Sequence, residues 1–151
     1  VDEYQLFEAK SMGADVILLI AACLNPAEVR SLAQKAHELD MEVLLEVHDS
    51  EELSQSLCDE VDMVGVNNRN LKTFTTTIET SLELVEQIPD SFVRISESGL
   101  KDAGTIIQLF QKGYQGFLIG ETFMKTPDPA AALADLQKTL FKKLNHNPQI
   151  V

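Results

Sequence analysis

The sequence has few positive charges, and this shortage excludes one large class of partners. Its 151 residues contain 12 Lys and Arg against 24 Asp and Glu, which gives a net charge of −12. The longest basic run is the pair Lys142 and Lys143. A surface that binds nucleic acid needs a basic patch. We therefore expect no nucleic-acid partner.

Long hydrophobic runs and metal-binding patterns are also absent. The longest apolar run, Val16 to Leu24, is far shorter than the roughly 20 residues that span a bilayer, and no signal-peptide pattern is visible. The two cysteines, Cys23 and Cys58, do not have metal-ligand spacing, and no His/Cys/Asp cluster has it either. We expect a cytoplasmic protein with reduced thiols, no membrane partner, no metal and no cofactor.

The residues that are present predict one α/β domain. Hydrophobic residues make up 44% of the chain, enough for a single core. Runs rich in β-branched residues begin near positions 15, 42, 62, 91 and 116 and alternate with helical patterns. After the first run, Asn25, Pro26 and Glu28 form the signature of a capped helix. Such alternation predicts a parallel sheet. We expect the domain to cover residues 1–145, followed by a polar tail at 146–151.

Two architectures fit this alternation: an open doubly wound sheet and part of a (β/α)₈ barrel. Polar residues follow several of the predicted strands, and this even spread favours the barrel, whose active sites lie at the carboxyl ends of its strands. Five strands do not close an eight-stranded barrel, which needs roughly 250 residues. We therefore expect a partial TIM (β/α)₈ barrel.

The segment Phe92–Gly99 is the most informative of the predicted strands. Its apolar start predicts a buried Phe92, while Ser96, Glu97 and Ser98 place polar groups where the strand ends. Gly99 has no Cβ, so a phosphate oxygen can approach the backbone N–H groups closely. The next strand ends in the same way at Gly120. Either glycine alone could serve only a turn, but together they favour a shared phosphate site.

Two further strand ends carry candidate catalytic or binding groups. Glu46 follows apolar residues in its strand, so partial desolvation should raise its pKa and suit it to acid or base chemistry; the alternative is a structural ion pair. His48 has the same parity, although a lone histidine is often a bystander. Asn67 and Arg69 lie on one face at strand spacing and could hold a carboxylate or hydroxyl. The alternative is an ordinary polar loop.

These segments closely resemble the indole-3-glycerol-phosphate synthase family, the (β/α)₈ enzymes of tryptophan biosynthesis. The resemblance runs nearly end to end, and its most specific parts are Asn-Asn-Arg-Asn-Leu and Ser-Glu-Ser-Gly. It is carried by residues 2–5, 13–20, 45–49, 65–71, 96–99 and 118–121.

The resemblance implies a role for each candidate residue. Glu46 would be the acid/base group, and Asn67 and Ser98 would position the substrate. The pocket would also be lined by Arg69, Leu18 and Glu97. The implied phosphate site uses Gly99, Gly120 and the backbone of Glu121.

The resemblance also implies which part of the barrel is present and what it would do. The chain would contain strands 4 to 8 with their helices, since Val1 matches a position just after the family's third strand. The family reaction closes the indole ring of a carboxyphenylamino-deoxyribulose phosphate with loss of carbon dioxide and water. It uses a lysine of the third strand as general acid, so we expect these 151 residues alone to be inactive.

Two other functions remain open at this point. One is a noncatalytic phosphate-binding half-barrel that associates with itself or with a complementary N-terminal chain, since open sheet edges favour association. The other is a related barrel such as phosphoribosylanthranilate isomerase. The lack of a Cys and Asp pair at the strand ends argues against this second enzyme, because Cys23 lies among apolar residues.

Overall fold

The fold is a single parallel sheet covered on one side by helices. A computed structural model describes residues 2–71 and 73–145. The strands are hydrogen-bonded in the order β1-β2-β3-β4-β5, all parallel. Their bounds are β1 Val16–Ile20, β2 Glu42–Val47, β3 Met63–Asn67, β4 Val93–Glu97 and β5 Gly116–Leu118. The predicted alternating α/β chain is confirmed.

The helices lie between and after the strands along the chain. The α-helices are α1 Glu3–Ser11, α2 Pro26–Glu38, α3 Ser50–Ser56, α4 Glu79–Leu84, α5 Ala103–Gln111, α6 Glu121–Met124 and α7 Pro129–Asn145, and the 3₁₀ helices are η1 Ala21–Cys23 and η2 Val85–Gln87. In the described part of the chain, no helix is both long enough and apolar enough to cross a membrane. The polar tail predicted at 146–151 lies outside the described residues.

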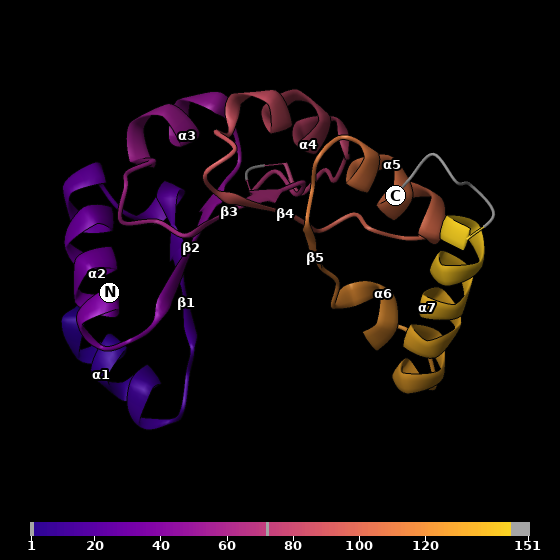
Figure 1. The fold of residues 1–151 in the computed structure, drawn as a ribbon, viewed down its shortest axis with the longest axis horizontal. Coiled ribbons are helices and arrows are strands. Elements are labelled where there is room, and N and C mark those ends of the chain that lie inside the picture. The colour runs from indigo at the N-terminus through magenta and orange to yellow at the C-terminus, as the bar shows by residue number, and fades with distance from the viewer. Residues whose placement is uncertain (1, 72, 146–151) are drawn as a thin grey trace.

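The sheet curves into an arch. Figure 1 shows the strands on the inner side of this arch and most of the helices on its outer side, with α1 near one end and α7 near the other. This arrangement is part of a (β/α)₈ barrel, in which a closed parallel sheet is surrounded by helices. The expected partial barrel is therefore confirmed.

Side-chain caps fix where several helices begin. The Asn25 side chain accepts from the backbone of Ala27 and Glu28, both at 3.0 Å, and the Glu28 carboxylate accepts from the Asn25 N–H at 2.8 Å. Asp49 caps α3 through the Glu52 N–H at 2.8 Å, and Asp102 caps α5. Asp49 follows β2 almost directly, while Asn25 and Asp102 follow β1 and β4 after a short connection, so the chain turns back over the sheet within a few residues.

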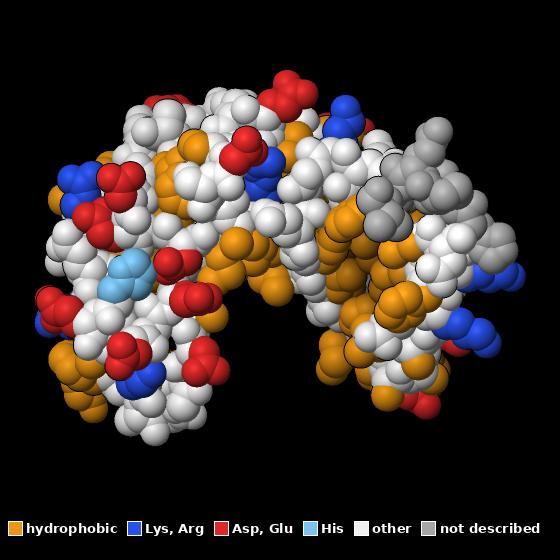
Figure 2. Space-filling model, viewed as in Figure 1, with side chains coloured by type: hydrophobic (Ala, Val, Ile, Leu, Met, Phe, Trp, Pro, Cys, Tyr) orange, Lys and Arg blue, Asp and Glu red, His pale blue; other side chains and the backbone are white. Residues whose placement is uncertain are grey.

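The two faces of the sheet have different surroundings. The residues that point toward the helices form the core, and Val43, Leu45, Val47, Val64 and Val66 are fully buried there. Figure 2 shows hydrophobic side chains along the hollow of the arch. On the strands, Leu18, Val93 and Leu118 of the inner face are 40–49% exposed.

The burial and placement predicted along the β4 segment were wrong in two places, at Phe92 and at Ser96. Phe92 precedes the strand and is only half-buried, and Val93 is exposed. Ser96 lies inside the strand, not at its end, and is fully buried because its parity directs it toward the helices. On the inner face the residues still change from apolar to polar along the strand, from Val93 and Ile95 to Glu97.

The two faces should respond differently to truncation. Leu45→Ala opens a cavity between the sheet and the helices and should lower the free energy of unfolding by about 2–5 kcal/mol. Leu18→Ala, on the adjoining strand but on the open face, should cost less than about 1 kcal/mol. Urea unfolding of the two variants measures the difference. Equal losses would contradict the assignment of the core to the outer face.

Candidate active site

The strand register brings four of the candidate residues onto the inner face of the sheet. Glu46 of β2 lies opposite Ile20 of β1 and Gly65 of β3, while Asn67 lies opposite Glu97 of β4. Leu18 is two residues before Ile20 on the edge strand, so it shares this face. The carboxyl ends of parallel strands meet at one end of the sheet. Glu46, Asn67 and Glu97 therefore lie together at that end.

Glu46 and Glu97 form a buried carboxyl pair. Each is 7% exposed, although they belong to strands that are not neighbours. The Glu97 side chain can cross the intervening strand β3 because Gly65 has no side chain there. A Cβ on Gly65 would lie 2.0 Å from Glu97 Oε1 and block this path. Glu97 thus extends over Gly65 toward Glu46.

This environment keeps Glu97 protonated at neutral pH. Burial away from water, followed by repulsion from the Glu46 carboxylate and a hydrogen bond with Glu46, raises the pKa of Glu97 to about 8. Glu97 Oε1 is buried and accepts no hydrogen bond from any residue that the structure describes, which also disfavours the ionised form. A neutral acid therefore lies beside a carboxylate, and two such groups can take different roles in proton transfer.

His48 lies next to this pair and is not an isolated surface residue. Its side chain is 10% exposed, with Nε2 3.4 Å from Glu46 Oε1 and Nδ1 3.0 Å from Glu52 Oε2. The same Glu52 oxygen accepts the His48 backbone N–H at 2.8 Å. The first turn of α3 therefore fixes the imidazole ring beside Glu46. Among the described residues, no three His, Cys, Asp or Glu side chains are grouped as a metal site requires.

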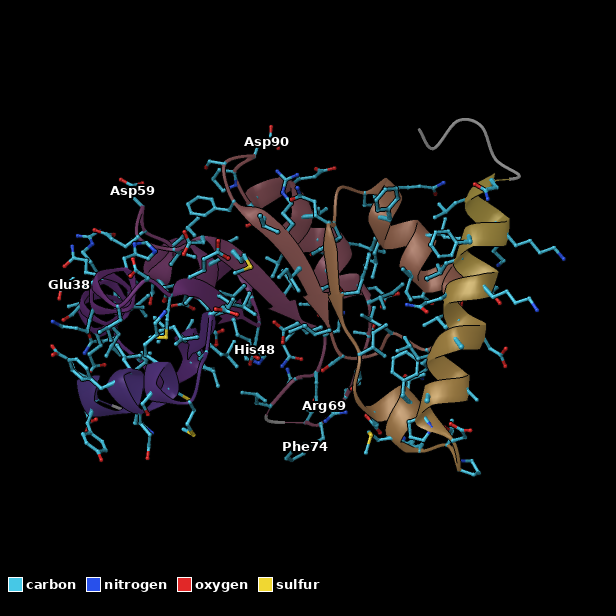
Figure 3. The ribbon with its side chains drawn as sticks, turned by 60° about the horizontal axis from the view of Figure 1, so that its bottom comes forward. Glu38, His48, Asp59, Arg69, Phe74 and Asp90 are labelled. Atoms are coloured by element: carbon cyan, nitrogen blue, oxygen red, sulfur yellow. The ribbon has the colours of Figure 1, made fainter. Side chains whose placement is uncertain are left out.

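A cavity of about 820 Å³ adjoins the ends of β4 and β5. It contains several of the candidate residues that the sequence assigned to substrate and phosphate. The lining residues are Arg69, Phe74, Thr76, Ser98, Gly99, Leu100, Lys101, Leu118, Ile119, Gly120, Glu121, Thr122 and Lys125. In Figure 3, Arg69 and Phe74 lie at one end of the strands, while Asp59 and Asp90, which precede β3 and β4, lie at the other. Leu18, Glu46, Asn67 and Glu97 are not among the lining residues.

Of the two positions in the predicted phosphate site, position 99 requires glycine and position 120 does not. Gly99 has φ +71°, and a Cβ there would lie 2.8 Å from Thr76 Cγ2, so only glycine fits. Ser98 before it also has a positive φ, +63°. Gly120 has φ −110°, and a Cβ there would meet nothing within 4 Å. Its backbone faces open space that a ligand can enter.

Three positive side chains line the cavity: Arg69 from the loop after β3, Lys101 from the loop before α5 and Lys125 from the end of α6. Arg69 extends from the loop after β3 and forms a short ion pair with Glu121, which also pairs with Lys125 at 2.5 Å. The charges of Lys125 and Arg69 hold the pKa of Glu121 below its usual value. The Asn67 side chain accepts the Arg69 N–H at 3.0 Å, so Asn67 stabilises this loop as well as facing the inner side of the sheet.

Several contributors to the site are not evident from the strand-end pattern. Gly65 is one, although an isolated glycine inside a strand is a known sign of close approach by another group. Lys101, Lys125, Phe74 and Thr76 come from loops and helix ends, where spacing carries no signal about a distant strand. Only the fold places them at the cavity.

Comparison with known proteins decides the family. The model of the family described as indole-3-glycerol phosphate synthase matches residues 1–136. The chain belongs to this family. The synthase of Bacteroides thetaiotaomicron is 50% identical over 140 residues, covering 93% of this chain and 54% of that protein. The synthase of Albidiferax ferrireducens is 42% identical over 139 residues, covering 92% and 53%. The chain thus spans about half the length of these curated relatives.

Solved structures of other enzymes share the fold. The 3-hexulose-6-phosphate synthase of Salmonella typhimurium superposes with a TM-score of 0.74 at 13% identity, covering 93% of this chain and 68% of that one. KGPDC from Streptococcus mutans gives 0.67 at 14%, covering 92% and 67%. At such low identity the likeness concerns the fold alone.

The protonated state of Glu97 predicts an unusual dependence of stability on pH. Its pKa is higher in the folded chain than in the unfolded one, so between about pH 4.5 and 8 the folded state holds more protons. Raising the pH through this window should therefore destabilise the protein. Glu97→Gln keeps the shape of the neutral acid and should remove this loss. The measurement is urea unfolding of both proteins from pH 5 to 9. A constant stability difference between them would contradict the raised pKa.

Proposed function

We propose that these residues supply the strand 4 to strand 8 part of an indole-3-glycerol phosphate synthase, a carbon–carbon lyase of tryptophan biosynthesis. The reaction would close the indole ring of carboxyphenylamino-deoxyribulose phosphate with loss of carbon dioxide and water. The observation that carries the proposal is the Glu46 and Glu97 pair, one acid and one carboxylate, at the end of the sheet that also bears the cavity of Arg69, Ser98 and Gly99.

The carboxyl pair suits the proton transfers of this reaction. Ring closure and dehydration require a proton to be given to an oxygen and taken from a carbon, and a positioned side chain typically contributes about 10²- to 10⁴-fold to such steps. In the proposal Glu46 exchanges the proton with the substrate. Glu97 contacts the substrate and, because its pKa is raised, is the protonated member of the pair. Asn67 and Ser98 position the substrate, and Leu18 offers an apolar contact from the same face.

The cavity suits the phosphate. At Gly99 and Gly120 no side chain covers the backbone that lines the cavity. Glu121 would contribute its backbone N–H, as in other phosphate sites built from backbone amides. Arg69 provides a planar cation that can bind either a phosphate or a carboxylate. The proposed ligand is therefore a phosphorylated small molecule that carries a second anionic group. We also propose a cytoplasmic location, because the acidic composition has no basic or long apolar segment.

A complete barrel would need further strands beside β1 and β5. In the described sheet each of these strands pairs on one side only, and an open parallel edge favours association. The curated relatives, of which this chain covers about half, have the length for a complete barrel. We propose that complementary strands, in the same polypeptide or in another chain, close the sheet and bring the lysine acid of the third strand. A second copy of this chain is the alternative partner.

The test is a chimera that restores a full-length barrel. The 140 matched residues of this chain would replace their counterparts in the synthase of Bacteroides thetaiotaomicron. The chimera should turn over carboxyphenylamino-deoxyribulose phosphate, whereas residues 1–151 alone should bind inorganic phosphate without turnover. A folded chimera that binds phosphate but does not form indole-glycerol phosphate would favour the noncatalytic half-barrel instead.

In this chimera, Glu46→Gln separates catalysis from structure. The amide keeps the shape of the side chain but cannot exchange a proton, so kcat should fall by about 10²- to 10⁴-fold while KM changes little. A structural ion-pair residue would behave differently, since breaking a buried pair lowers stability and leaves the turnover of the folded enzyme intact. Steady-state kinetics beside thermal unfolding measure both. A destabilised variant with normal kcat would remove Glu46 from the catalytic residues.

Glu121 makes a separate prediction about the phosphate site. Its carboxylate competes with an incoming anion for Arg69 and Lys125, but the backbone N–H does not depend on the side chain. Glu121→Gln should therefore tighten the binding of inorganic phosphate by roughly three- to tenfold, because a nearby negative charge is removed. Glu86→Gln, an exposed glutamate outside the cavity, makes the same change in net charge and should leave the affinity unchanged. Weaker binding by the Glu121 variant would refute this role.

A further inference from the structure

Asn68 is a buried polar residue that none of the candidate roles uses. It is 1% exposed and follows the last residue of β3. Its side-chain Nδ2 lies 3.0 Å from Ser96 Oγ, 3.0 Å from the Glu97 carbonyl oxygen and 3.1 Å from the Ser98 carbonyl oxygen. The three acceptors lie on consecutive residues, Ser96 and Glu97 of β4 and Ser98 directly after it. From sequence, Asn68 looks like a turn residue, but its side chain points into the structure.

The other polar groups of Asn68 are also satisfied. Its Oδ1 accepts the Ser81 N–H at 3.1 Å, its backbone N–H donates to the Glu97 carbonyl at 2.9 Å, and its carbonyl accepts the Thr77 N–H at 3.1 Å. An asparagine amide has two N–H hydrogens and here faces three oxygens, so one hydrogen is shared. Asn68 thus joins the end of β4, the loop after β3 and the first turn of α4.

Neighbouring buried groups hold this arrangement in place. Ser81 Oγ and Ser96 Oγ are 2.8 Å apart, and the Tyr114 hydroxyl donates to the Ser81 carbonyl at 2.8 Å. Ser81, Ser96 and Tyr114 are at most 1% exposed. Burial raises the pKa of Tyr114 to about 12, so its hydroxyl remains a donor at any ordinary pH. A fully satisfied buried network of this kind is rigid.

The hydrogen bonds from Asn68 hold Ser98, the residue after β4, whose backbone conformation is unusual. Ser98 has φ +63°, a region that residues with a Cβ seldom adopt and that other contacts must stabilise. The Glu97 carbonyl belongs to the peptide group before Ser98, and the Ser98 carbonyl belongs to the one after it. Asn68 donates to both, so it fixes both peptide groups that define the Ser98 conformation.

We propose that Asn68 is a positioning residue for the substrate site. By holding Ser98 in the left-handed conformation, it aims the Ser98 side chain and the Gly99 N–H at the cavity and keeps the preceding Glu97 directed toward Glu46. This role rests on the proposed function, because it concerns the substrate and phosphate that the cavity would bind. A displacement of about 1 Å in such groups can cost about 10²-fold in rate.

The test is Asn68→Ser in the chimera that restores a full-length barrel. Serine is too short to reach both carbonyl oxygens, so the end of β4 should relax. We expect KM for the substrate and the inhibition constant of inorganic phosphate to rise together by about tenfold, with a fall in kcat. A purely structural residue would lower only the folded fraction. Losing folded enzyme lowers the apparent kcat but leaves KM unchanged, so the change in KM identifies positioning.

Tyr114→Phe provides the matched control. It removes one hydrogen bond from the same buried network but touches neither the Glu97 carbonyl nor the Ser98 carbonyl. It should lower the melting temperature while KM and phosphate inhibition stay within about twofold of the unaltered chimera. The proposal is overturned if Asn68→Ser keeps a normal KM, or if Tyr114→Phe raises KM equally.

A measurement on the unaltered 151-residue chain covers the case in which Asn68→Ser fails to fold. The Asn68 side-chain amide hydrogens should be protected from exchange with solvent, and their NMR signals should shift together with the Gly99 amide when inorganic phosphate is added. Rapid exchange, or a Gly99 shift without any Asn68 response, would overturn the proposal. A chimera that lacks turnover but shows this joint response would refute the enzyme function and leave the positioning role standing.

Discussion

The in-register parallel pairing of β2, β3 and β4 is the constraint on which the site depends. Side chains alternate between the two faces of a strand, so a shift of one residue would turn Glu46 or Glu97 toward the helices. The fully buried aliphatic residues on the outer face prevent that shift, because it would expose them to the hollow. The hydrophobic contact between sheet and helices thus determines where the carboxyl groups lie, although it does not touch them.

This register places the Glu46 and Glu97 carboxyl groups together in a buried site, and protonation of Glu97 avoids the repulsion between two negative charges. Two carboxyl groups at 7% exposure cannot both be ionised without a large cost, and none of the described residues donates a hydrogen bond to Glu97 Oε1. Burial and the neighbouring Glu46 therefore raise the pKa of Glu97 to about 8, which favours its protonated form. The folded protein therefore loses stability as the pH rises from about 4.5 to 8, and in this range it holds an acid beside a carboxyl group. Such costs are typical of sites that perform chemistry and are hard to explain for a purely structural strand end.

The sequence predicted those features that local patterns determine. The five strands, the capped helix after Asn25 and the placing of Glu46 at a strand end follow from periodicity and capping chemistry, which act over a few residues. Ser96 was misjudged because its burial depends on which face of β4 the helices cover, and Phe92 because it precedes the strand and is only half-buried. The raised pKa of Glu97 depends on the missing Cβ of Gly65 in another strand. Such effects join residues that are distant in sequence, and one chain without its fold does not reveal them.

The end of β4 connects the two parts of the candidate site. Glu97 closes the strand and faces Glu46, while Ser98 and Gly99 follow at once with positive φ and line the cavity. The proposed acid/base and anion-binding groups are therefore consecutive residues, and a movement of this one segment would alter both. In the proposed site, rigidity at this point would matter more than rigidity elsewhere in the sheet. Buried Asn68 donates to the carbonyl groups on both sides of Ser98 and so holds the segment that joins the proposed binding and acid/base groups.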